Sequence, residues 1–417
     1  MKQMKKGVCA AVALLLSVAL LLGASAAVKV DDNIDRAMEF YRSELGPAFA
    51  EGGLTAEVWE LICALQTGKA DDPDYAFMVT EGPELTDKSM PSDYAKKLMA
   101  LLLLGKDSSA LAKELAAMQN DEGAFEHGEV ALVTNTSFSL LALLAAKANG
   151  VETDFDCDKA VEAIIAQAKQ DHGYNDYGEE GNVDTTGMVL LGLAAAKANG
   201  CQAADAAVDS AAGYIKSTLQ DTGYFVGNGQ YDTPNACSQA YAIIGLIAAG
   251  ENMNDAKWEP SINVLLACQD VGGGFWYQED RVEGEWPFTP DQMSTYEAIM
   301  AMLDYKNGES FLVSLAVEPY APSSSQPTAV SSQAAQPAES SVSVSSAEAS
   351  ANVPSTNDGS SDRVNPKTGD EGINPLIWIV LGAAVVAVLV VALLPVFTKK
   401  KGKEDQPEQR EDDNEPK

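Results

Sequence analysis

The sequence repeats itself, and this repeat constrains the fold more than any other feature. Residues 140–150 read LLALLAAKANG and residues 190–200 read LLGLAAAKANG, the same segment displaced by 50 positions. Self-similarity at such a period is typical of architectures in which one supersecondary unit stacks on the next. Each copy is an apolar run that ends in glycine, which commonly follows a helix in the left-handed conformation. The pattern predicts helix stops at Gly68, Gly105, Gly150, Gly200, Gly250 and Gly308.

A second motif is offset from the first. A glutamine ends an apolar segment and is followed by glycine and an aromatic residue, as from Gln119 to Phe125 and from Gln269 to Phe275. An acidic, glycine-rich connection then leads to the next helix, which we expect to begin at an Asn or Asp N-cap. The predicted caps are Asn135, Asp184, Asn235 and Asp291.

Each unit is therefore predicted to be a pair of helices. The more uniformly apolar, inner helices are predicted at 55–67, 92–104, 135–149, 184–199, 235–249 and 291–306. Their partners are predicted at 33–46, 73–82, 108–119, 158–169, 204–219 and 257–269. About six pairs suffice to close a ring, so we expect an all-α (α/α)6 toroid over residues 28–320, with an open α-solenoid as the alternative. Aromatic residues make up only 7% of the chain, which agrees with helices better than with a β-sandwich.

The two ends of the chain predict export and anchoring. Three lysines precede an apolar run and a box of small residues, which predicts a signal peptide over residues 1–26 rather than a membrane anchor. Residues 321–364 are rich in Ser, Ala and Pro and are expected to form a disordered stalk. Residues 375–397 are uncharged and long enough to span a bilayer as a transmembrane helix. Lysines follow this span, so the charged tail at 398–417 is expected in the cytoplasm.

The segment just before the predicted span carries a recognisable motif. Residues 365–370 read NPKTGD and resemble the sortase sorting signal of Gram-positive bacteria, with Asn365 where that family usually has Leu. The resemblance implies cleavage between Thr368 and Gly369 and attachment to the cell wall. The expected partners at this end are the membrane and a sortase. The expected location is the extracellular face of the plasma membrane, or the cell wall, of a Gram-positive bacterium.

The glutamine–glycine–aromatic motif, followed by an Asn- or Asp-capped helix, is similar to the repeats of squalene–hopene cyclases and protein prenyltransferase β subunits. The resemblance covers most of residues 28–320 and implies their α/α toroid. Terpenoid cyclases of this kind protonate an alkene or epoxide with an Asp-x-Asp-Asp-Thr-Ala run. The matching residues 182–187 read NVDTTG and keep only Asp184 of these acids. We interpret Asp184 first as an N-cap, and a residual catalytic acid is its alternative role.

The resemblance also implies a place for catalytic zinc, and this sequence does not fill it. The Asp-x-Cys pair of the prenyltransferases falls on Asn235 and Cys237, and their His falls on Met293. Catalytic zinc needs about three ligands of that kind. We therefore expect no zinc thiolate site, and we interpret Cys237 as a small apolar core residue.

The connections at 120–134, 171–184, 221–234 and 270–291 are expected on one rim, where the inner helices begin. They carry much of the formal net charge of -33, and Arg281 is their one Lys or Arg. A field of this sign disfavours nucleic acid as a partner. Acids beside aromatic faces suit a cation, a glycan or Ca²⁺. The candidate ligand-binding residues are Asp176, Tyr177, Asp184, Tyr231, Trp276, Tyr277, Trp286 and Asp291.

Three functions remain open at this level. The first is a tethered surface protein that binds a small molecule, glycan or cationic partner at the rim, and we favour it because the catalytic sets are incomplete. The second is an enzyme of the terpenoid cyclase or prenyltransferase class. The third is a polysaccharide-acting (α/α)6 enzyme, whose paired carboxylates the sequence does not single out. A structural explanation competes with all three, since acids favour the positive ends of helices and aromatics can fill gaps between helix pairs.

Overall fold

The computed structural model describes residues 27–128, 132–226, 234–277 and 290–321. By its internal contacts the chain divides into residues 1–333 and 334–417, and every described residue belongs to the first unit. The described part consists of helices and short loops, with no β-strand. The all-α prediction is confirmed for this part.

Six helices form an inner layer. They are α4 (Val58–Gln66), α5 (Pro91–Leu103), α7 (Val133–Ala148), α9 (Val183–Ala198), α11 (Ala236–Ala248) and α13 (Gln292–Asn307). Their bounds lie close to the predicted ranges. Helices α7, α9 and α11 are buried on nearly all sides, which explains why they are largely apolar, whereas α5 keeps a partly exposed polar stripe with Asp93, Lys96 and Lys97.

The outer layer is less regular. Its α-helices are α2 (Asp31–Phe40), α3 (Gly46–Ala50), α6 (Ser109–Ala116), α8 (Cys157–Ala166), α10 (Ala203–Ser217) and α12 (Glu259–Ala267). A π-helical turn, Tyr41–Leu45, joins α2 to α3, and 3₁₀ helices lie at Pro73–Met78 and Ala256–Trp258. The helix predicted at 73–82 is thus only a short 3₁₀ helix, because the backbone is already extended at Val79.

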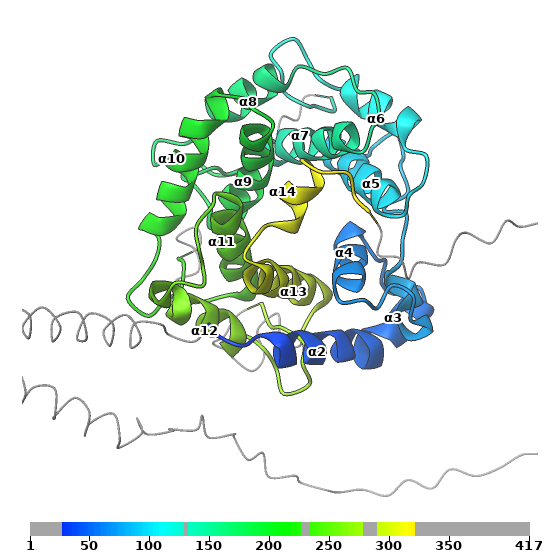
Figure 1. Ribbon diagram of the computed structural model, residues 1–417, viewed down its shortest axis with the longest axis vertical. Coiled ribbons are helices and arrows are strands. Elements are labelled where there is room, and N and C mark those ends of the chain that lie inside the picture. Colours follow the sequence, from blue (N-terminus) through cyan, green and yellow to red (C-terminus); the bar gives the residue numbers. More distant parts are fainter. Residues whose placement is uncertain (1–26, 129–131, 227–233, 278–289, 322–417) are drawn as a thin grey trace, which may run out of the picture. The chain divides into compact units, whose positions relative to one another are not determined.

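The inner helices contact one another in sequence order. Contacts join α5 to α7, α7 to α9, α9 to α11 and α11 to α13, and α4 contacts both α5 and α13 (Figure 1). The contacts therefore run in a closed circuit. Two hydrogen bonds between residues far apart in sequence join the last helix pair to the first. Asn33 Nδ2 donates to Gln269 Oε1 (2.6 Å), and Gln269 Nε2 donates to the Asn33 carbonyl (2.8 Å).

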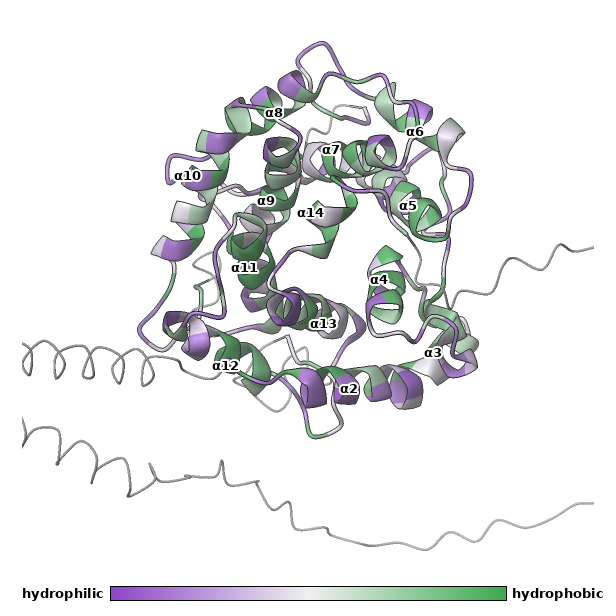
Figure 2. Cartoon of the chain, in the orientation of Figure 1, coloured by the Kyte–Doolittle hydropathy of each residue, from purple (hydrophilic) through white to green (hydrophobic). Residues whose placement is uncertain are grey.

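Hydropathy follows the two layers. Figure 2 shows apolar residues along the inner helices and hydrophilic residues on the outward faces of α2, α8 and α10. The six predicted glycine stops all have positive φ, between 63° and 91°, which is the left-handed conformation that ends a helix. The repeat thus predicted both the helices and their ends.

Two inner helices approach each other unusually closely. A Cβ atom on Gly187 of α9 would lie 2.4 Å from the carbonyl oxygen of Tyr241 in α11. Only glycine permits such backbone-to-backbone contact. The close approach brings the start of α9 against the first turns of α11.

A short last helix, α14 (Phe311–Leu315), was not predicted. It contacts α7 and α9 and lies inside the circle of inner helices in Figure 1. Asn199 Nδ2 donates to the carbonyl of Ala316 (3.0 Å), and Asn149 Oδ1 accepts from the backbone N–H of Tyr320 (2.8 Å). Because Asn149 and Asn199 end α7 and α9, this segment covers the C-terminal ends of those helices.

The membrane predictions fall outside this part of the chain. Across the described ranges, no helix combines the length and apolar character needed to cross a bilayer. The predicted leader at 1–26, the sorting signal and the span at 375–397 all lie outside the described residues.

Candidate functional site

The four connections that precede α7, α9, α11 and α13 share one construction. An isolated β-bridge closes each of them, pairing for example Gln119 with Phe125 and Gln269 with Phe275. The backbone N–H of Phe125 donates to Thr136 Oγ1 on the following inner helix (3.1 Å). The aromatic residues after the glycines are at most 2% exposed: Phe125, Tyr174, Phe225 and Phe275. These four aromatics are core residues that join neighbouring helix pairs.

The predicted N-caps are half right. Asn235 Oδ1 accepts from the backbone N–H of the residue three positions on (2.7 Å), and Asp291 Oδ1 does the same (2.8 Å), so both caps are confirmed. Asn135 lies inside α7, which begins at Val133. The N-cap interpretation favoured for Asp184 is wrong, because Asn182 Oδ1 is the acceptor at the start of α9 (2.9 Å). Asp184 is the second residue of the helix and is left for another role.

The candidate rim residues do not gather at one place. Asp176 Oδ2 accepts from Thr134 Oγ1 (2.5 Å) and therefore fixes the first turn of α7. Tyr177 is 88% exposed, whereas Trp276 is only 9% exposed and donates from Nε1 to Asp270 Oδ2 (3.2 Å).

The remaining rim residues have backbone roles or lie elsewhere. The carbonyl of Tyr277 accepts from the backbone N–H of Ala236 (2.8 Å), at the start of α11. Tyr231, Trp286, Thr368 and Gly369 lie outside the described residues. Of the described candidates, Asp184 and Asp291 lie near Glu297, and the charges of both act on it. We call these three acids and their neighbours the cluster around Glu297.

The cluster lies where α9, α11 and α13 meet. Asp184 interacts with the Ser238 side chain, and its charge acts on both Cys237 and Glu297. Glu297 has hydrogen-bond partners in Cys237 and Tyr241. The close contact of α9 with α11 and the packing of α11 on α13 thus bring two acids, a thiol and a phenol together.

Two carboxylate oxygens in this cluster lack partners. Asp184 is partly exposed as a residue, yet its Oδ1 is fully covered and has no hydrogen-bond partner in the described part of the chain. Glu297 is 3% exposed, and its Oε2 is likewise covered and has no hydrogen-bond partner in the described residues. An unsatisfied buried oxygen costs about 1–3 kcal/mol, and Asp184 and Glu297 supply the two carboxylate oxygens among the buried side-chain atoms without partners in the described residues.

Burial determines the protonation of these acids. It raises the pKa of Glu297 to about 8, with the charges of Asp184 and Asp291 adding to the effect. Burial also raises the pKa of Asp184. A carboxyl group with a pKa near 8 is mostly protonated at neutral pH, where it donates a hydrogen bond instead of attracting a cation.

The surroundings of the Cys237 thiol do not resemble those of a metal ligand. Burial raises the pKa of Cys237 well above that of an ordinary thiol, and its Sγ lies 3.6 Å from Ser294 Oγ. Met293, at the place of the prenyltransferase His, is 43% exposed. Within the described residues, no three His, Cys, Asp or Glu side chains are grouped to hold a metal ion.

Sequence reasoning missed Glu297, the most buried acid of the cluster. Its signal was present: a glutamate stands inside the apolar run MSTYEAIMAM of the last inner helix. A charged residue at a position that the helical period buries is uncommon unless it has a partner or a function.

Comparison with known proteins places the chain only loosely. No protein-family model and no curated protein matches it. Among solved structures, it is similar to ent-copalyl diphosphate synthase from Streptomyces platensis with a TM-score of 0.40 and 19% identity, over 62% of this chain and 49% of the synthase. The chain thus spans about half the length of that protein. It is similar to a polysaccharide lyase with a TM-score of 0.42 and 12% identity, over 66% of this chain and 98% of the lyase. These low scores assign no function to the chain.

Proposed function

We propose that this protein is a surface-tethered (α/α)6 toroid that binds an uncharged, hydroxyl-rich ligand, a glycan or related polyol, at the cluster of Asp184 and Glu297. The observation that carries the proposal is the pair of buried, unpartnered carboxylate oxygens at the start of the inner helices. The closed circuit of contacts among the inner helices supports the toroid, since α4 of the first unit contacts α13 of the last.

Burial raises the pKa of both acids, which favours their neutral forms and points to the class of ligand. Neutral carboxyl groups donate hydrogen bonds to hydroxyl or ether oxygens, whereas a cation prefers ionised acids. Asp184 is the contact residue because it is partly exposed at the first turn of α9. Glu297 is almost fully covered and acts behind it by holding Tyr241 and Cys237 in place.

The cluster and the last described segment lie at opposite ends of the inner helices. Asn149 and Asn199 bind that segment to the C-terminal ends of α7 and α9, whereas the cluster lies at the N-terminal ends. Surface tethering is tested separately from ligand binding. Protease treatment of intact cells is expected to release peptides from residues 27–321 and none from 398–417.

A general-acid enzyme is the second candidate, and one observation favours it. Burial raises the pKa of Asp184, and a carboxyl group that holds its proton more tightly than usual can deliver it to a bound substrate. Asp184 would then be the catalytic acid of a cyclase-like or glycan-cleaving reaction. Turnover of an isoprenoid or release of reducing sugar, lost in Asp184→Asn, would establish this candidate in place of simple binding.

The binding proposal is tested by thermal-shift and calorimetric titration of the protein with wall glycans, polyols, cationic peptides and Ca²⁺. We expect a glycan or polyol to raise Tm, and we expect Asp184→Asn to weaken its binding at least tenfold. Asp304→Asn is the matched control: Asp304 is a buried acid on the same helix as Glu297, but its Oδ1 accepts from the backbone N–H of Phe311 (3.1 Å). Silence across the panel, or equal affinity in Asp184→Asn and wild type, would contradict the proposal.

A further inference from the structure

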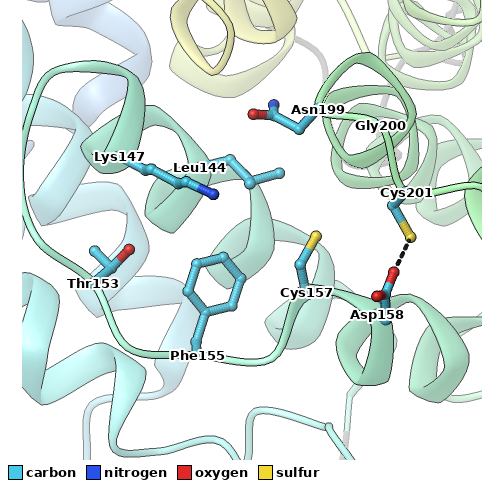
Figure 3. A pocket seen from close by; sticks show the side chains of 9 residues that line it. All are labelled: Leu144, Lys147, Thr153, Phe155, Cys157, Asp158, Asn199, Gly200 and Cys201. Atoms are coloured by element: carbon cyan, nitrogen blue, oxygen red, sulfur yellow. Dashed lines mark hydrogen bonds between the residues drawn. The ribbon is translucent and has the colours of Figure 1, made fainter.

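A second feature of the fold lies away from the acidic cluster, at the other ends of the inner helices. A pocket with a volume of 210 Å³ lies between the ends of α7 and α9 and the start of α8. Cys157, the first residue of α8, and Cys201, which follows α9, both line it. Figure 3 shows the two thiols at one end of the pocket, with Cys201 Sγ bonded to Asp158 Oδ1 at 2.9 Å.

The two thiols are neighbours. Both sulfurs lie at the same end of the pocket in Figure 3, and the nearby Cys201 thiol adds to the effect of burial in raising the pKa of Cys157. They come from adjacent repeats, because the 157–201 segment includes all of α8 and α9. Both sulfurs border the pocket, so a small reagent can approach them.

The other cysteines of the described residues are placed differently. Cys63, Cys237 and Cys268 are at most 3% exposed and belong to, or directly follow, three different helices. All five cysteines are present as free thiols. Cys157 and Cys201 are therefore the pair that geometry selects for joining.

We propose that Cys157 and Cys201 are a modification site: they form a disulfide bond that ties the start of α8 to the α9–α10 connection when the chain meets a small-molecule or protein disulfide. In the first step the Cys157 sulfur attacks one sulfur of the oxidant and releases one thiol, leaving a mixed disulfide. In the second step the Cys201 sulfur attacks Cys157 and releases the second thiol. The oxidant gains two electrons and the two protons of the protein thiols, and the protein gains one S–S bond.

The surroundings of the pair indicate a structural bond rather than a redox-active one. Burial raises the pKa of Cys157 to about 12, and burial together with the Asp158 hydrogen bond raises that of Cys201. Catalytic dithiols have lowered pKa values, which stabilise the reduced form and make the disulfide easy to reduce. The opposite environment here favours a disulfide that forms slowly without a catalyst and then resists reduction.

The test uses the full-length chain, reduced and then incubated in a glutathione redox buffer with a disulfide isomerase. Peptide mapping by mass spectrometry without reduction is expected to recover one cross-linked pair, containing Cys157 and Cys201. The midpoint of thermal unfolding is expected to rise by about 5 °C and to return on reduction, since the bond closes a loop of nearly one repeat.

Matched variants separate this pair from the other thiols. Cys268→Ser should keep the cross-link, and Cys157→Ser and Cys201→Ser should lose it. The wild-type peptide map does not depend on any variant folding. Recovery of both cysteines as free thiols after oxidation, a lasting glutathione adduct on Cys157, or a cross-link to a different cysteine would each overturn the proposal.

Discussion

Glu60 of α4 and Glu297 of α13 are both deeply buried glutamates on adjacent inner helices, yet they are used differently. Glu60 Oε1 accepts from Gln292 Nε2 (2.6 Å) and from the Tyr41 hydroxyl (3.3 Å), and its Oε2 accepts from the backbone N–H of Glu57 (2.8 Å). Both of its oxygens are therefore satisfied. Glu297 keeps one buried oxygen without a partner. Burial alone does not distinguish a structural acid from a functional one, whereas the state of its hydrogen bonds does.

The locations of the two acids fit this distinction. Glu60 lies at the junction where the last unit meets the first, and Gln292, its partner, is the first residue of α13. Its hydrogen bond with Gln292 joins segments 232 residues apart in sequence. Glu297 lies beside Asp184 and Cys237, where it closes no junction of this kind. We therefore assign Glu60 to closure of the fold and Glu297 to the candidate site.

The largest expected effect is a loss of stability as pH rises. Burial raises the pKa of Glu60 to about 7 and that of Glu297 to about 8, from the ordinary glutamate value of 4.5. Both carboxyl groups thus bind protons more tightly in the folded state, and the unfolding free energy falls as pH rises from about 4.5 through these values. One such shift corresponds to roughly 3 kcal/mol. Urea unfolding at pH 5 and pH 8.5 measures the difference, and equal stability at the two values would refute it.

The next effect is a difference in unfolding free energy between Glu60 and Glu297 when each is replaced by glutamine. Glu60→Gln places an amide NH₂ against one of three donors, and we expect it to lower the unfolding free energy by about 2 kcal/mol. Glu297→Gln replaces an oxygen that has no partner, so its cost is expected to stay below about 1 kcal/mol. Urea unfolding at pH 7, followed by the fluorescence of Trp59 and the other tryptophans, gives both values. A larger loss for Glu297→Gln would reverse the assignment of the two acids.

The smallest effect distinguishes the cap of α9 from the acid next to it. Asn182→Ala removes the side-chain acceptor of the first turn and is expected to cost about 1 kcal/mol of unfolding free energy. Asp184→Asn keeps the polar contact with Ser238 and is expected to cost less than about 0.5 kcal/mol. In ligand binding the order should be reversed: Asp184→Asn should weaken binding more than Asn182→Ala does. If Asp184→Asn were the more destabilising, Asp184 would have a structural role.

Local features of the fold were predictable from sequence. Gly150 and Gly200 end α7 and α9 where the repeat predicted it, and Asn235 and Asp291 cap α11 and α13. Such features depend on residues within one helical turn, so their signals are complete in the sequence. The short helix α14 escaped prediction because five residues carry too little periodicity.

The candidate site was predictable only in part. Asp184 was found through a motif, but the choice between Asn182 and Asp184 as the cap depended on where α9 begins, and helix bounds are the least certain element of sequence reasoning. The rim residues Asp176 and Trp276 were grouped by charge and aromatic character. The structure gives each of them a separate partner instead, Thr134 for Asp176 and Asp270 for Trp276.

The sequence by itself determined the paired helices, their order and their glycine ends, because periodicity and capping are short-range properties of the chain. Tertiary structure alone decided that Asp184 and Glu297, on helices α9 and α13, come together beside α11. It also brought together Cys157 and Cys201, which belong to adjacent repeats. Their chemistry depends on burial and on neighbours more than 40 residues away in sequence, and no local pattern encodes which carboxylate loses its solvent and keeps its proton.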